Sequence, residues 1–218
     1  MKRLMLILVV VAAAIVVPLG AAAAGNEAQK MAMKPAVYTQ AVVDLRNAMR
    51  MLWEEHIVYT RTFIISALAG LDDTSKVAER LLKNQDDIGN AIKPYYGDAA
   101  GTALAGLLRT HILIAADIVS AAKSGDNDGV ANGEKKWSAN AEDLATFLSS
   151  ANSNWPKSSL RDMLDIHLAY TTTEVVSRLS KNWTADMEAY DKGHAHMLMF
   201  ADMLSDGIVK QFPAKFTR

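Results

Sequence analysis

The strongest constraint on this chain is the helical period of its apolar residues. From Val37 onward they recur at three- and four-residue steps, and the alternation typical of strands is absent. Proline and glycine fall mainly between the periodic stretches, where they end helices and form turns. The pattern predicts an all-α fold with six helices, near residues 37–70, 74–93, 99–124, 128–151, 157–181 and 184–211.

An internal repeat of about 55 residues groups the six predicted helices into three pairs. The odd helices each carry a histidine at a similar place, and the even helices carry an asparagine or histidine: His56, His111 and His167 against Asn84, Asn140 and His194. The connections are short, which makes neighbouring helices antiparallel. We therefore expect a six-helix up-down bundle of three antiparallel hairpins, mainly monomeric, as a single domain over residues 37–213.

Composition removes several classes of function. The chain has 218 residues and no cysteine, which excludes disulfides, thiolate zinc sites and cysteine-ligated iron–sulfur clusters. Its 23 Lys and Arg against 24 Asp and Glu give a formal charge of −1, which argues against nucleic acid as a partner.

The N-terminus has the features of a secretory signal. A basic start at Met1 to Arg3 precedes the apolar stretch 4–17, and small residues follow at 20–25. We expect residues 1–24 to be a signal peptide and residues 25–36 a tether, which predicts an extracytoplasmic protein, periplasmic or secreted. The alternative is a retained membrane anchor, because residues 4–24 are uncharged and could span a bilayer.

Each predicted helix places one imidazole or carboxamide on its apolar face near its middle. A buried polar group without a partner costs about 1–3 kcal/mol, so the six side chains must bind each other, a ligand, a metal or water. One interpretation is structural: hydrogen-bonded pairs fix the helix register. The pairs would be His56–Asn84, His111–Asn140 and His167–His194.

The other interpretation is a small ligand or a transition metal held at the level of these side chains. Neutral imidazole suits Zn, Cu, Ni and Fe, and bundle cores are a recurrent place for metal sites. The candidate ligands are His56, His111, His167 and His194, with Glu174 and Met197 as weaker ones. Bis-histidine haem is the less favoured cofactor, because it needs a larger pocket.

A smaller signal lies in the last predicted helix. His196, Met199 and Met203 share one helical face, and imidazole with thioether favours Cu(I). The simpler interpretation is that these methionines fill gaps in the core.

Signatures of common enzymes are missing from the sequence: there is no Gly-x-Ser-x-Gly elbow, no phosphate-binding loop and no His-Glu-x-x-His. We therefore expect a binding or sequestration protein rather than an enzyme.

Several short motifs resemble those of a family of uncharacterised bacterial helical-bundle proteins. They include Leu52-Trp53-Glu54-Glu55-His56 followed by Tyr59-Thr60-Arg61, then Pro94-Tyr95-Tyr96-Gly97, and a terminal Gln211-Phe212-Pro213. The resemblance spans about residues 45–213. It implies a helical bundle and no established activity, cofactor or catalytic residue.

Overall fold

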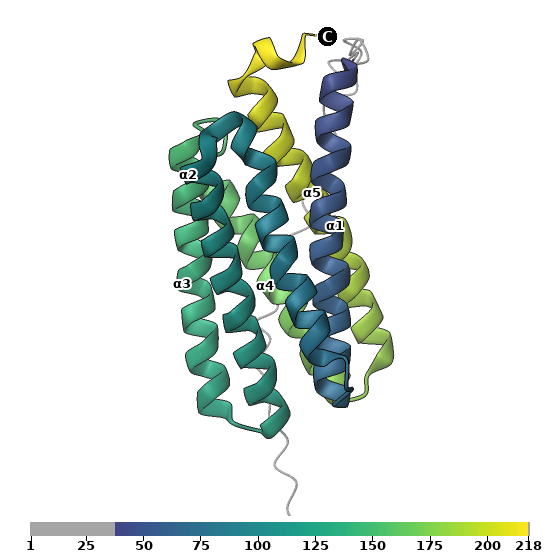
Figure 1. Ribbon diagram of the computed structural model, residues 1–218. Helices are drawn as coiled ribbons and strands as arrows, with labels where there is room; N and C mark the ends of the chain where they lie inside the picture. Colours follow the sequence, from purple (N-terminus) through teal and green to yellow (C-terminus); the bar gives the residue numbers. More distant parts are fainter. Residues whose placement is uncertain (1–37, 218) are drawn as a thin grey trace, which may run out of the picture. The chain divides into compact units, whose positions relative to one another are not determined.

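The computed structural model describes residues 38–217 and is all-helical over that range, which confirms the predicted fold class (Figure 1). The predicted signal peptide 1–24 and tether 25–36 lie outside the described residues. The elements are α1 Gln40–Ala69, α2 Thr74–Ser124, α3 Asn127–Ala151, α4 Lys157–Leu179, α5 Trp183–Gln211 and the short 3₁₀ helix η1 Pro213–Phe216.

The helix ends follow the predicted punctuation. Asp126 and Asn182 stand before α3 and α5, and the side chain of each accepts a backbone N–H from the first turn. Gly70 and Gly125 end α1 and α2 in the left-handed conformation, with φ of 69° and 76°, which glycine adopts without strain. Local sequence therefore sets these four boundaries.

Within residues 38–217 the structure has five α-helices where the sequence predicts six. The expected helices 74–93 and 99–124 form one element, α2, which folds back on itself at Gly97. Gly97 has φ 85° and ψ 168°, a conformation open essentially to glycine alone. Pro94 stays inside the first arm, so a single residue makes the turn for which the sequence suggested a five-residue connection.

The two arms of α2 lie side by side. A Cβ atom built on Gly89 would come within 2.4 Å of the Gly101 carbonyl oxygen, so only glycine permits this approach. Farther along the arms, Arg109 forms an ion pair with Asp86 at 3.1 Å. The arms are thus antiparallel neighbours, as Figure 1 shows.

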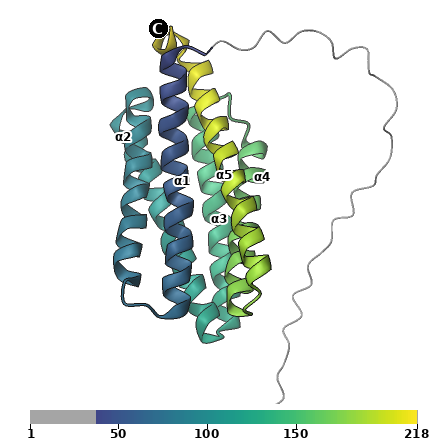
Figure 2. The same ribbon diagram turned by 90° about the vertical axis from the view of Figure 1, so that its right-hand side faces the viewer.

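The elements of residues 38–217 form a closed ring. Each helix packs against the next one in the chain, and α1 also packs against α5 (Figure 2). Every helix can therefore direct one face to a common axis. The main hydrophobic core lies along that axis and includes Trp53, Trp155 and Phe200.

One helix of the described region, α2, is long and apolar enough to pass a length-and-composition test for a membrane span. It reverses at Gly97, and it contributes core residues such as Leu104 and Leu108. A core helix of a bundle passes the same test.

Candidate functional site: a buried histidine layer

Three buried histidines meet near the middle of the bundle axis. His56 lies on α1, His111 on the second arm of α2 and His167 on α4, and each is at most 3% exposed. The ring centre of His167 is 5.6 Å from that of His56 and 5.9 Å from that of His111. The prediction that these three histidines face inward is confirmed.

Three further side chains each donate a hydrogen bond to a main-chain carbonyl four residues before one of these histidines. The bonds are Asn84 Nδ2 to Leu52 O at 2.9 Å, Asn140 Nδ2 to Leu107 O at 3.1 Å and His196 Nε2 to Met163 O at 2.8 Å. In an α helix the same carbonyl also accepts the N–H of the histidine itself. We call these three donors and the three histidines the histidine layer.

His111 is fully hydrogen-bonded. Its Nδ1 lies 2.9 Å from Asn140 Oδ1, which can only accept, so Nδ1 carries the proton. Trp137 Nε1 donates to His111 Nε2 at 3.1 Å. The predicted His111–Asn140 pair is confirmed, and the imidazole is held as a single neutral tautomer.

The predicted His56–Asn84 pair is wrong. Gln85, the next residue along, takes the place beside His56, with its Nε2 at 3.3 Å from His56 Nδ1. Asn84 donates to Leu52 O instead, and its Oδ1 accepts from Gln85 Nε2 at 3.0 Å. Both neighbours are buried because α2 has packed helices on two sides here. The helical period of the sequence does not show which of two adjacent residues at the edge of a buried face contacts the neighbouring helix.

The predicted inward position of His194 is also wrong. Its side chain is 30% exposed, and its Nε2 lies 3.4 Å from Glu54 Oε1. His196 is the buried histidine of α5. The two residues are about 200° apart on a helix, so only one of them can face the axis. The pair His167–His194 is therefore not formed, and His194 is not a member of the layer.

A signal in the sequence could have found His196. Asn84, Asn140 and His196 are spaced by 56 residues at both steps, which is more regular than the series that ends at His194.

The weaker metal candidates lie away from the layer's histidines. Glu174 Oε1 is 2.9 Å from Arg61 in a separate ionic cluster, and Met197 is packed in the hydrophobic core. Met199 is 57% exposed, so the predicted His196–Met199–Met203 face is not a buried site. Within residues 38–217, no three His, Asp or Glu side chains are placed to hold one metal ion.

Burial keeps the three histidines neutral. Loss of solvent lowers the pKa of His56 to about 3 and that of His111 to about 4, and the nearby imidazole of His111 lowers the pKa of His56 further. The pKa of His167 falls well below its usual range, first by burial and then through His56 and His111. Protonation at neutral pH is therefore strongly disfavoured.

Three buried polar atoms in or beside the layer have no hydrogen-bond partner in the described part of the chain. They are His167 Nδ1, Gln85 Oε1 and Trp53 Nε1. Buried groups of this kind are rare and call for an explanation, such as a bound water or ion.

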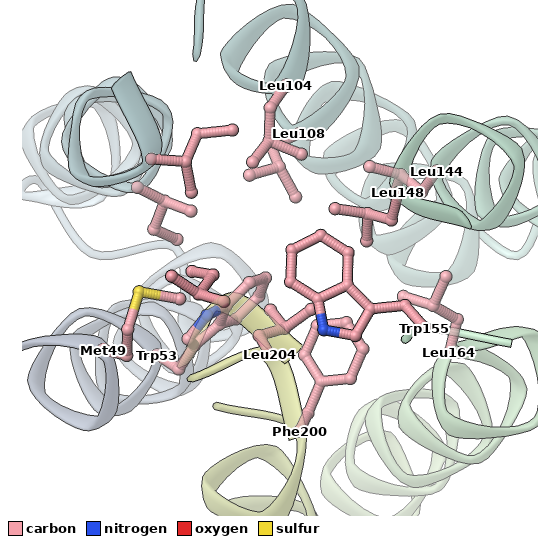
Figure 3. A pocket seen from close by; sticks show the side chains of 13 residues that line it. Met49, Trp53, Leu104, Leu108, Leu144, Leu148, Trp155, Leu164, Phe200 and Leu204 are labelled. Carbon is pink, nitrogen blue, oxygen red and sulfur yellow. The ribbon is translucent and has the colours of Figure 1, made fainter. Parts of the chain in front are cut away.

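An apolar void lies one helical turn from the layer (Figure 3). Six of its lining residues lie one helical turn from the layer. Three of them, Trp53, Leu108 and Leu164, come three residues before His56, His111 and His167. The other three, Ile88, Leu144 and Phe200, come four residues after Asn84, Asn140 and His196. The void is narrow, with a volume of about 20 Å³, which leaves room for about one water molecule. The void offers no polar group to orient a substrate.

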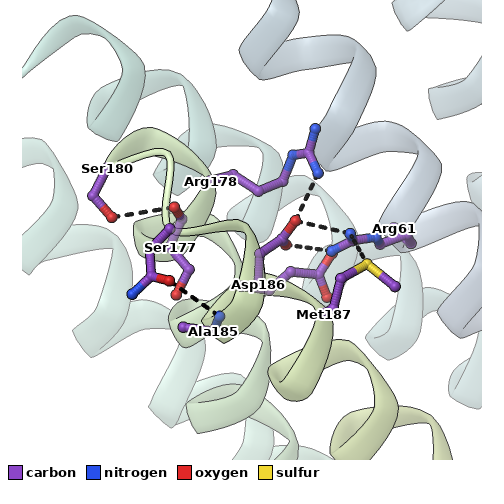
Figure 4. A network of polar contacts seen from close by, with 9 residues as sticks. Arg61, Ser177, Arg178, Ser180, Ala185, Asp186 and Met187 are labelled. Atoms are coloured by element: carbon purple, nitrogen blue, oxygen red, sulfur yellow. Dashed lines mark hydrogen bonds and ion pairs between the residues drawn. The ribbon is translucent and has the colours of Figure 1, made fainter.

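An ionic cluster joins α1, α4 and α5 and was not predicted. The Asp186 carboxylate, only 2% exposed, accepts hydrogen bonds from Arg61 and from Arg178, the latter at 2.8 Å (Figure 4). Glu174 also pairs with Arg61, and burial raises its pKa. Charge pairs on separate helices leave no local pattern in a sequence, so only the folded chain brings them together.

No protein-family model, curated protein or solved structure matches this chain. The resemblance noted from the sequence motifs therefore stays a prediction.

Proposed function

We propose that this chain is an exported helical-bundle protein that acts by binding rather than by catalysis, and that its histidine layer fixes which helices pack together and in which register. One observation carries the structural part: the bond from a layer donor to the carbonyl four residues before a histidine occurs three times, across sequence separations of 32, 33 and 33 residues. A register shift would leave these buried donors unpaired.

We also propose that the fold consists of three related helical hairpins, each with one histidine and one donor of the layer. The first arm of α2 would belong to the first hairpin and the second arm to the second. The near-constant spacing of donors and histidines supports this relation, since unrelated helices have no reason to repeat the same side-chain-to-carbonyl bond.

The properties of the layer favour a non-catalytic role. A general acid or base works best with a pKa near the working pH, whereas the pKa values of His56 and His111 lie near 3 and 4. The adjacent void is apolar and narrow. These features suit a group that holds a core together.

The equivalence of the three donors gives a direct test. Asn84 and Asn140 reach their carbonyls from the position that His196 occupies in the third unit. His196→Asn should therefore keep most of the stability, whereas His196→Leu should lose about 1–3 kcal/mol of unfolding free energy.

Denaturant unfolding with and without a chelator measures both effects. Equal losses in the two variants would contradict the proposed role of the donor. Loss of the wild-type fold on chelator treatment would show that a metal, and not the hydrogen bonds, holds the layer.

Export rests on the basic, apolar and small-residue segments of residues 1–24. The intact mass of the protein recovered from the periplasm or medium tests it. A mature chain that begins near residue 25 supports cleavage, and a full-length chain in the membrane fraction supports the anchor instead.

A further inference from the structure

The centre of the histidine layer carries an inference beyond helix packing. We propose that it binds one monovalent soft metal ion, Cu(I), through a ring nitrogen of each of His56 and His167. His111 lies beside this site as a neutral neighbour and is not a ligand.

The first support is the weak hydrogen bonding of one nitrogen on each of the two rings. His167 Nδ1 has no partner among the described residues. His56 Nδ1 has only Gln85 Nε2 at 3.3 Å. The two hydrogens of that amide nitrogen already go to Leu81 O at 2.8 Å and Asn84 Oδ1 at 3.0 Å. His167 Nδ1 is therefore a buried nitrogen without a partner, and the contact of His56 Nδ1 is one long bond from an amide that has two other acceptors.

The second support is the distance between the two rings. An imidazole bound at about 2.0 Å has its ring centre about 3.2 Å from the ion, so two such rings lie about 5.2–6.4 Å apart for bond angles from about 109° to 180°. The ring centres of His56 and His167 are 5.6 Å apart. The observed separation of the two rings falls within this range.

The third support is charge. The cost of burying an ion grows with the square of its charge, so a buried site without an anionic ligand favours a monovalent ion over a divalent one. The chain has no thiolate, and the carboxylates of Glu174 and Asp186 already pair with Arg61. Imidazole is a ligand for copper, and the absence of an anionic group beside these nitrogens favours its monovalent form, Cu(I).

His111 does not share in the binding, because both of its nitrogens are already used. Asn140 accepts from Nδ1, and Trp137 donates to Nε2. A two-histidine site also agrees with the finding that no three His, Asp or Glu side chains of residues 38–217 are placed around one point.

Titration of the mature chain with Cu(I) under anaerobic conditions, in competition with a chromophoric Cu(I) chelator, tests the proposal. The samples are incubated until the melting temperature is constant, because the layer is enclosed. We expect one Cu(I) per chain, a higher melting temperature, and X-ray absorption that shows nitrogen neighbours and no sulfur. Sulfur scattering, which would point to the methionines, or failure to compete at one equivalent overturns the proposal.

Matched variants locate the ion. His56→Gln and His167→Gln should each weaken Cu(I) binding by at least about 100-fold, more than the loss of an outer-shell partner costs. His194→Gln and Met199→Leu, both outside the layer, should bind as the wild type does. Loss of binding in either control, or equal binding by Zn²⁺ in the wild type, overturns the assignment. If a layer variant does not fold, the X-ray absorption of the wild type still decides between nitrogen and sulfur ligands.

This test is independent of the packing role. Chelator-insensitive stability and the comparison of His196 variants decide the packing role, whereas Cu(I) stoichiometry decides the metal site.

Discussion

Asn140 shows how a single carboxamide can serve two helices. Its Nδ2 donates to the carbonyl of Leu107, and its Oδ1 accepts from His111 Nδ1, so one side chain of α3 satisfies two groups of α2. Both contacts lie in or at the edge of the core, where water cannot replace them. The contribution of Asn140 to the unfolding free energy therefore comes mainly from the polar groups that its removal would leave unpaired.

Replacing Asn140 with leucine should lower the unfolding free energy by about 1–3 kcal/mol, because the Nδ1–H of His111 loses its acceptor. Asn132 is the matched control, as an exposed asparagine on the same helix. Asn132→Leu should change stability by no more than about 0.5 kcal/mol. Urea unfolding of both variants measures the difference, and similar effects would show that the layer bond contributes nothing.

At the scale of the elements, α2 owes its shape to glycines with different roles. Gly97 makes the reversal through its positive φ, whereas Gly89 and Gly101 let the two arms approach closely. Gly106 lies on the same element with open space where a Cβ would be. One helix thus offers the same substitution in a crowded and in an open environment.

Gly89→Ala should destabilise the fold by about 1–3 kcal/mol, since the added methyl would meet the Gly101 carbonyl and the arms would have to separate. Gly106→Ala should stabilise it by about 0.5–1 kcal/mol, because alanine is the better helix former and nothing obstructs it. Thermal unfolding compares the two. The prediction is that the two substitutions change the stability in opposite directions. A gain of stability in both variants would mean that the two arms of α2 are not in close contact.

The ionic cluster of Asp186 links three helices near the α4–α5 turn. Asp186→Asn should lower the unfolding free energy by about 3–5 kcal/mol, because it removes the buried partner of two partly buried arginines, Arg61 and Arg178. Asp165→Asn removes an exposed ion pair with Arg161 within α4 and should cost no more than about 0.5 kcal/mol. Denaturant melts at high and low salt check both values. Equal losses of unfolding free energy in the two variants would show that Asp186 is exposed to solvent and not buried.

At the scale of the whole molecule, the buried histidines couple folding to pH. In the unfolded chain His56 and His111 bind protons near their usual pKa of 6.5, whereas in the fold their pKa values are about 3 and 4. Between these limits the unfolded state binds more protons. The unfolding free energy therefore keeps its full value above pH 6.5 and decreases as the pH falls toward the folded-state pKa values of about 4 and 3.

With a chelator present, the unfolding free energy should fall by up to about 1.4 kcal/mol per pH unit for each buried histidine once the pH is well below 6.5. His111→Gln should reduce this slope by the share of one histidine. The raised pKa of Glu174 acts in the opposite sense, but it is common to all variants. Denaturant melts between pH 7 and 5 measure the slopes, and a flat profile would contradict the buried neutral state.

The sequence by itself determined the helical class, the helix boundaries marked by Asp126 and Asn182, and the inward direction of His56, His111 and His167. These features are local: caps act within one turn, and a period of 3.6 residues places a side chain on one face of its own helix.

Only the tertiary structure decided that Gln85 and not Asn84 lies beside His56, that Gly97 alone reverses α2, and that Asp186 meets two arginines. The rotation of each helix about its own axis explains why the sequence does not determine which neighbouring residue is buried. A small turn of a helix about its axis exchanges neighbouring residues at the edge of the buried face, and that rotation is set by packing against helices distant in the sequence.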